Sequence, residues 1–285
     1  MGKKFVLNAV GLGMSKAINR GIAEALDDGI LKSASLTANG AAFDDAVNTV
    51  ISKNTELGIG VCLNITTGHS ICTDLKILTD SKGNFKNTFW GLLINSVNPK
   101  NKEFTEELER EFRRQIEKVM AASKVNYIES FDGIHIIPGL YNLVCKLAKE
   151  YNIAYVISHY EKLYIVPEIF RHFKFKFFLN IFRTLLFNFL TLFDENIIHK
   201  YELKTNDYIL GGIYKDMMDS LAVSYGIASV RYEKVLMHCS IHPCRYDEGT
   251  IDEHFNDFLI TKNMKLKTRL EKAGFEITNY VEKET

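Results

Sequence analysis

Short apolar segments alternate with amphipathic segments along most of this chain, and this alternation is the feature that most limits its fold. The apolar segments have the length of buried strands and span residues 5–7, 30–36, 59–65, 127–129, 153–157, 234–237 and 275–280. The amphipathic segments repeat apolar side chains at helical spacing and span residues 15–28, 43–53, 104–122, 138–150 and 255–273. Strands that alternate with helices over short connections predict parallel βα units. We therefore expect an α/β fold, a distorted and nearly closed (β/α) barrel, with a doubly wound sheet as the second possibility.

The length of the chain fits one domain of this kind. A chain of 285 residues and 32.6 kDa is ordinary for an α/β barrel, and 46% hydrophobic residues can fill a sizeable core. No internal repeat or low-complexity linker divides the sequence. Residues 1–285 are therefore predicted to form a single domain.

Charge and cysteine content limit the partners and the compartment. The 35 Lys and Arg residues balance 35 Asp and Glu residues, so no net field favours nucleic acid or an acidic membrane as a partner. The five cysteines form no C-x-x-C pair, which suits a reducing compartment better than a disulfide framework. Residues 1–4 lead directly into the first strand, without the apolar region of a signal peptide. We expect a cytoplasmic protein.

Four potential zinc ligands fall within the seven residues His238-Cys239-Ser240-Ile241-His242-Pro243-Cys244. Structural zinc sites use a second, separated pair of ligands, which this segment lacks. We therefore interpret it as a strand end that carries buried thiols.

Residues Phe173 to Phe193 are dense in Phe and Leu and form a predicted helix within an aromatic-rich segment at about 163–200. Their polar residues are spaced by three and four and form one narrow stripe: Lys176, Asn180, Arg183, Thr184, Asn188 and Thr191. No apolar run reaches the roughly 18 residues of a membrane span. The favoured interpretation is a helix mostly buried against the barrel or in a homodimer interface. The alternative is an apolar lip for an amphipathic substrate, or a peripheral membrane contact through Phe173–Phe193.

The first strand ends in Gly11-Leu12-Gly13, a pattern that also occurs in phosphate-binding turns. A dinucleotide-binding turn needs a third small residue at the start of the helix and an acidic residue at the tip of the second strand. Lys16 stands at the third position, and Asp27 and Asp28 lie in a predicted helix end. The sequence therefore does not favour a nucleotide cradle.

The segments that follow are more specific. They include 17–22 (AINRGI), 28–40 (DGILKSASLTANG), 60–68 (GVCLNITTG), 78–85 (LTDSKGNF) and 128–135 (IESFDGIH). In this order they resemble the signature of the YdjC/ChbG-like carbohydrate deacetylases, strongly to about residue 140 and loosely beyond. The resemblance implies a distorted, polysaccharide-deacetylase-like barrel with a divalent metal, such as zinc or magnesium, at the carboxyl ends of the strands. In that family one Asp and two His residues hold the metal, and a neighbouring Asp is the general base of amide hydrolysis.

The residues that carry this chemistry in the family are replaced in this sequence. The resemblance places the base and the metal-binding Asp at Val10 and Gly11, the strand His at Cys62 and the first His of the later loop at Phe131. Only the last His of that loop remains, as His135. Val, Gly and Phe supply no side-chain ligand, and one Cys does not hold a catalytic metal. We expect no cofactor.

The favoured hypothesis is a non-catalytic member of the family, a pseudoenzyme that binds an amino sugar or a glycolipid. The alternative is an active hydrolase that removes N-acetyl groups through a rearranged metal centre or a cysteine-based one, with Cys62, His135 and His242 as weak catalytic candidates. A third possibility is a scaffold at a membrane surface. The substrate-binding candidates are polar residues at strand ends and in the predicted mouth: Asn8, Asn19, Asn64, Asp132 and His135.

Overall fold

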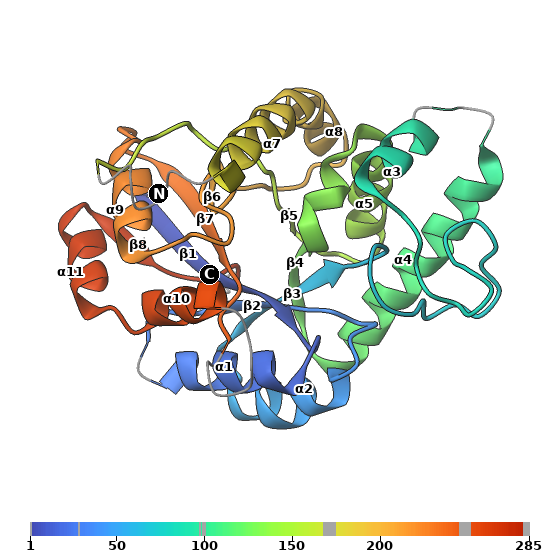
Figure 1. Cartoon of the computed structure of the whole chain (residues 1–285), viewed down its shortest axis with the longest axis horizontal. Coiled ribbons are helices and arrows are strands. Elements are labelled where there is room, and N and C mark those ends of the chain that lie inside the picture. The colour runs from blue at the N-terminus through green and yellow to red at the C-terminus, as the bar shows by residue number, and fades with distance from the viewer. Residues whose placement is uncertain are drawn as a thin grey trace.

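One curled parallel sheet organises the chain (Figure 1). The computed structural model describes residues 2–27, 29–96, 98, 101–167, 175–244 and 252–281. Its strands are β1 (Lys3–Leu12), β2 (Ser33–Leu36), β3 (Gly58–Leu63), β4 (Val125–Ser130), β5 (Tyr155–Val156), β6 (Tyr208–Leu210), β7 (Val235–Ile241) and β8 (Phe275–Ile277). Within these residues the sheet order is β5-β4-β3-β2-β1-β7-β6, and β8 pairs with the first half of β1.

Helices surround the sheet, so that it forms a half-barrel within a single α/β domain (Figure 1). They are α1 (Lys16–Asp27), α2 (Phe43–Thr49), η1 (Ile51–Lys53), α3 (Phe89–Ser96), α4 (Lys102–Ala122), η2 (Phe131–Ile136), α5 (Pro138–Glu150), α7 (Phe175–Thr191), α8 (Asp194–Lys200), α9 (Ser220–Ala228), α10 (Asp252–Thr261) and α11 (Met264–Lys272). Parallel strands place their carboxyl ends at one edge, which we call the mouth. The predicted α/β barrel-like fold is confirmed.

The centre of the sheet shows why the apolar segments became strands. Residues Phe5 to Leu12 of β1 are all buried, because β1 lies between neighbouring strands and under helices on its outer side. Ser15 caps α1 as expected, since its Oγ accepts a hydrogen bond of 3.2 Å from the Ile18 amide. α5 begins at Pro138, as predicted, because Pro is well suited to the first turn of a helix.

Several bounds differ from the sequence predictions. The single helix expected over 255–273 is two helices, because the Asn263 side chain accepts a 3.0 Å bond from the Leu266 amide and caps a new helix. The segment 70–97, expected to be loops, contains α3. A buried carboxylate on α4 fixes the middle of this segment, since Glu107 accepts hydrogen bonds from the amides of residues 76–78.

The orientation of α7 reverses the favoured expectation for this helix. Its polar side chains face the protein, and Asn180, Thr184 and Thr191 are at most 8% exposed. Six of its apolar side chains are exposed, whereas Phe177, Phe187 and Leu190 are buried, so the prediction of a helix mostly buried against the barrel is wrong. The alternative of a homodimer interface stays a prediction. The polar stripe is held at the mouth by hydrogen bonds to backbone groups, which the packing of apolar side chains would not satisfy. Residues 168–174 of the predicted aromatic segment, including Phe173, lie outside the described residues.

Within the described part of the chain, no single helix is long and apolar enough to cross a membrane. α7 and α8 pass a test of length and composition only as a pair, which is bent by 43°.

Candidate functional site

A small cavity of about 60 Å³ lies at the mouth, under the polar face of α7. Its walls come from the ends of β1, β4 and β7, from the segment after β5 and from α7. Gly133 permits this close approach, because it has a φ of +66° and an added Cβ would lie 2.8 Å from the His159 ring and 2.9 Å from Phe187. The volume suffices for a few water molecules and is too small for a sugar ring.

A larger groove of about 600 Å³ adjoins the cavity between α3 and α7. Asp132, Arg183, Phe187 and Lys215 line both spaces, so the cavity forms the polar end of the groove. Trp90, the one tryptophan in the sequence, lines the groove and is 54% exposed. The groove has the size that small-molecule sites usually have.

Charged side chains gather where the cavity meets the groove. Asp132 pairs with Lys215, and Arg183 donates a 2.8 Å hydrogen bond to the Asp132 carbonyl oxygen. The Arg183 guanidinium lies 4.5 Å from the centre of the Phe187 ring, where a cation–π contact is favourable. Burial opposes ionisation of Asp132, but Lys215 outweighs it and keeps the pKa of the carboxyl below its usual value. Asp132 is therefore an anion between two cations.

Glu161 is a second carboxyl group in the cavity and is only 1% exposed. Its two oxygens accept hydrogen bonds from the amides of Gly211 (3.1 Å) and Ile213 (2.9 Å). Burial raises the pKa of Glu161 to about 7, although these amides favour the ionised form. The carboxyl group therefore holds the segment 211–213 and titrates near neutral pH.

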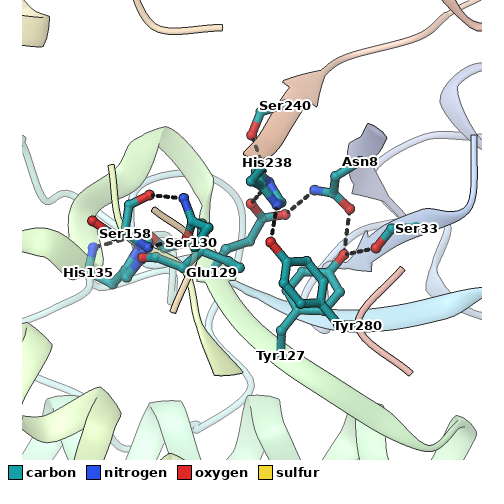
Figure 2. Close-up of polar contacts among 12 residues, drawn as sticks. Asn8, Ser33, Tyr127, Glu129, Ser130, His135, Ser158, His238, Ser240 and Tyr280 are labelled. Atoms are coloured by element: carbon teal, nitrogen blue, oxygen red, sulfur yellow. Dashed lines mark hydrogen bonds and ion pairs between the residues drawn. The ribbon is translucent and has the colours of Figure 1, made fainter. Parts of the chain in front are cut away.

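A hydrogen-bonded network fills the interior of the half-barrel below the cavity (Figure 2). Tyr127 donates to the Asn8 side-chain oxygen, and the Asn8 amide donates to Glu129 over 2.7 Å. His238 lies 3.6 Å from the other Glu129 oxygen and 2.8 Å from the Tyr280 hydroxyl. Burial opposes ionisation of Glu129, but His238 and Asn8 outweigh it and lower the pKa of the carboxyl. Both ends of the Asn8 amide are used within this network, and Asn8 lies beneath the cavity, whereas Glu129 and Ser240 of the network line it.

His135 is also bound within the protein. Its Nε2 lies 2.7 Å from the Ile157 carbonyl oxygen and must donate to it, so its Nδ1 accepts from Ser130 over 2.6 Å. Burial lowers the pKa of His135 to about 4, so the ring is neutral at physiological pH. His135 lies behind the wall of the cavity, where its ring packs against that of His159.

Cys62 is fully buried on β3. Burial, and then the charge of Glu129, raise the pKa of its thiol, although the neighbouring Thr37 and Ser35 hydroxyls act in the other direction. The thiolate form that a nucleophile requires is therefore strongly disfavoured.

The remaining candidates from the sequence are divided between the mouth and the scaffold. His242 lines the cavity, and burial lowers its pKa to about 4, so it too is neutral. Asn19 is placed away from the cavity, where its oxygen accepts from the Gly13 amide (2.8 Å) and its nitrogen donates to Asp45 (2.8 Å). Asn64 closes the turn after β3, since its oxygen accepts from the Thr66 amide (3.1 Å). Of the five substrate-binding candidates, Asp132 faces the cavity and the groove.

The residues at the expected metal position do not fit a metal ion. Val10 lines the cavity without a ligand atom, Gly11 has no side chain, Phe131 is partly buried and apolar, and the Cys62 thiol is enclosed. Among the residues that the structure describes, no group of three or more His, Cys, Asp or Glu side chains could hold a metal ion. The five cysteines, all described, are free thiols, and Cys239 and Cys244 are buried.

Sequence reasoning missed Glu161, Arg183, Lys215 and Trp90 as residues of this site. The sequence places Arg183 in the polar stripe of α7, but it does not show that this stripe faces the cavity. Glu161 and Lys215 stand in segments without helical or strand periodicity, so only the folded chain brings them together.

Comparisons with known proteins agree with this architecture. A model of the family described as YdjC-like protein matches residues 4–272. Proteins named carbohydrate deacetylase from Brevibacillus brevis and Clostridium beijerinckii are 36% and 34% identical over 151 residues, which are 53% of this chain and 57% and 58% of theirs. The match thus spans little more than half the length of these relatives.

Two solved structures share the fold. A protein of Enterococcus faecalis V583, provisionally described as a cellobiose-phosphate cleavage protein, is similar with a TM-score of 0.75 and 20% identity over 98% of both chains. A protein of Agrobacterium tumefaciens C58 is similar with a TM-score of 0.51 and 9% identity over 98% of this chain and 87% of its own.

Proposed function

Because the chain belongs to the YdjC-like protein family, we propose that it binds a carbohydrate of the kind that deacetylases act on, an amino sugar or a sugar-bearing lipid, without catalysing metal-dependent deacetylation. The ligand would lie in the groove between α3 and α7 and direct a polar group into the cavity.

One observation carries this proposal: three acid and imidazole groups beneath and beside the cavity are committed to hydrogen bonds within the protein, although His159 Nε2 and Thr184 Oγ1 on its wall have no partner. Glu129, His238 and His135 are bound within the networks beneath and beside the cavity. The positions that resemble the family's ligands hold Val10 and Gly11, which have no donor atom. A metal-activated water needs protein ligands with free lone pairs, so the geometry supports binding better than hydrolysis.

The groove suits a sugar in shape and in chemistry. Trp90 and Phe182 line its outer part and can cover the apolar faces of sugar rings. Asp132 can accept hydrogen bonds from hydroxyl or amino groups, and Arg183 and Lys215 can donate to hydroxyl or amide oxygens. The groove therefore offers apolar surface for sugar rings and charged side chains that can hydrogen-bond to a sugar's polar groups.

Binding and hydrolysis can be measured on the same sample. We expect oligomers of N-acetylglucosamine and of glucosamine to change the fluorescence of Trp90, with no acetate released in the absence or presence of added zinc or magnesium. Asp132→Asn should weaken binding measured by calorimetry at least about fivefold, in line with loss of a charge-assisted hydrogen bond. Asp74→Asn is the matched control, because Asp74 forms an exposed ion pair with Arg110 outside the groove.

Two results would overturn the proposal. Metal-dependent release of acetate would show an active hydrolase with a rearranged centre, and loss of that activity on alkylation of Cys62 would place it at the thiol. Absence of binding to every amino sugar, glycolipid headgroup and oligomer tested would remove the carbohydrate ligand.

A further inference from the structure

The outward surface of α7 and of the two residues after it consists of large apolar side chains. Phe175 is 78% exposed, Leu192 66% and Phe182 63%. The set, which we call the α7 apolar face, has exposed fractions between 48% and 78% and comprises Phe175, Phe178, Leu179, Phe182, Leu185, Phe189, Leu192 and Phe193. These eight side chains contain no hydrogen-bonding atom.

The opposite side of α7 fixes this orientation. The Asn180 amide donates to the Lys215 carbonyl oxygen over 2.9 Å, and the Asn188 side chain exchanges two hydrogen bonds with the backbone of Glu161, of 2.9 and 2.8 Å. Lys176 pairs with Asp216 at 2.9 Å. Turning the helix to bury its apolar face would break these bonds and leave buried backbone groups without partners. These hydrogen bonds and the ion pair therefore fix the outward position of the α7 apolar face in the folded domain.

The face is larger than the apolar patches that monomeric proteins usually expose. A buried aromatic side chain covers 150–250 Å², so each half-exposed side chain leaves about 100 Å² open and the eight leave on the order of 800 Å². The largest patch on a typical monomer is about 300–600 Å² and is often functional. Its size is therefore that of an interaction site.

Two features favour a lipid bilayer over a second copy of the chain. An interface between proteins carries about ten hydrogen bonds, and the α7 apolar face offers no side-chain donor or acceptor, whereas a bilayer requires none. The face is also continuous with the groove, since Leu179 and Phe182 belong to both. A second copy seated there would close the groove, whereas a bilayer would leave its opening beside the membrane surface.

We propose that α7 is an interfacial helix by which the domain docks on a lipid bilayer, with its axis parallel to the membrane plane. Phe and Leu side chains enter the boundary between headgroups and acyl chains, as in other amphipathic helices at membranes. Trp90 on α3 stands at the edge of the inserted surface, a place where tryptophan is favoured. α7 lies along the mouth in Figure 1, so docking brings the groove to the membrane surface. This proposal stands whether or not the groove binds a sugar.

Vesicle flotation and the fluorescence of Trp90 test the docking directly. We expect the full chain to float with vesicles of phosphatidylcholine alone, and equally in low and high salt, because the contact face is uncharged. Trp90 emission should shift to shorter wavelength and be quenched by brominated lipids. The double substitution Leu185→Glu with Phe189→Glu should weaken vesicle binding at least about tenfold, because two apolar side chains no longer leave water. Neither residue lines the groove.

A matched control carries the same charges elsewhere. Leu259→Glu with Met264→Glu alters side chains that are 47% and 54% exposed on α10 and α11, against 48% and 56% for Leu185 and Phe189. This control should bind vesicles like the unaltered chain. Light scattering follows the mass of each protein in solution.

The outcomes separate the possible occupants. A particle of twice the 32.6 kDa chain mass that the Leu185 and Phe189 substitutions dissociate, together with no vesicle binding, would assign the face to a second copy and overturn the proposal. Binding only to anionic vesicles that high salt abolishes would also overturn it, as would equal loss of binding in the control. Failure of sugar binding would leave vesicle binding unchanged and would count only against the carbohydrate ligand.

Discussion

Asp194 provides a quantitative test of the energetics at the bend between α7 and α8. It is the first residue of α8 and is 3% exposed, and neither of its carboxyl oxygens has a hydrogen-bond partner. Burial alone raises the pKa of Asp194 from 3.8 to about 8. The folded protein therefore holds a proton on this group at pH 7, whereas the unfolded chain releases it near pH 4.

The sign of the effect on stability follows from this difference. The folded state binds more protons than the unfolded state between about pH 4 and pH 8, so the stability associated with Asp194 is present below pH 4 and is lost as the pH rises to 8. Each pH unit in this window costs about 1.4 kcal/mol. The free energy of unfolding therefore falls by about 3 kcal/mol from pH 5 to pH 7, and at pH 7 it is on the order of 4 kcal/mol lower than it would be with a protonated Asp194 in both states.

Asp194→Asn removes this titration and keeps the shape of the side chain. We expect the substituted protein to be more stable than the unaltered protein at pH 7, with a difference in melting temperature that grows by roughly 3 °C per pH unit between pH 5 and pH 7. Melting is followed by circular dichroism at several pH values. Glu161 titrates in both proteins, so its contribution cancels in the difference.

The control is Glu195→Gln, which removes an exposed carboxylate from the same helical turn. If the melting temperatures of Asp194→Asn and the unaltered protein differ by the same amount at every pH, then burial does not hold a proton on Asp194. The physical reasoning would then be refuted.

Two further substitutions test the site and the interior. Glu161→Gln should destabilise the protein by about 1–3 kcal/mol at pH 5. The Gln side chain has one acceptor oxygen, whereas the two carboxyl oxygens of Glu161 accept hydrogen bonds from two backbone N–H groups, those of Gly211 and Ile213. This difference in stability should shrink as the pH rises to 7, because burial raises the pKa of Glu161 to about 7 and the unaltered protein loses stability as the group ionises. A difference that grows with pH would contradict this account. Gly60→Ala should cost about 1–3 kcal/mol or more in a melting experiment, because the added Cβ would lie 2.2 Å from the Tyr127 ring. Gly91→Ala on α3 is its control, because an added Cβ there would lie 3.2 Å from the Thr88 hydroxyl oxygen and far from Tyr127; equal losses in both would show that the Tyr127 contact is not the cause.

The sequence predicted the fold well where local rules and packing agree. Ser15 and Pro138 mark helix starts by their own chemistry, and the structure follows them. β6 was missed because three residues are too few to show a period. A helical break at Asn263 was missed because apolar spacing continues across it, while the cap depends on the side-chain rotamer.

The site could be predicted less completely, for physical reasons. Periodicity in α7 defines two faces but does not say which one meets the protein, and backbone groups of residues 161 and 215 decide this. That Val10 and Gly11 carry no ligand atom could be read directly, because it depends only on residue type. The pairing of Asn8 with Glu129 could not, since the two residues are 121 positions apart.

The local structure around the lost ligand positions bears on how easily evolution could reverse the change. Gly11 sits at an irregularity in the pairing of β1 with β2 and has a φ of +88°, a region that costs other residues about 1–2 kcal/mol. Cys62 has no exposed surface, so a histidine in its place would have to displace its neighbours. Either substitution alone, of Gly11 by aspartate or of Cys62 by histidine, would lower the free energy of unfolding in the absence of a bound metal. Restoring a ligand at either position by a single substitution is therefore expected to reduce the stability of this fold.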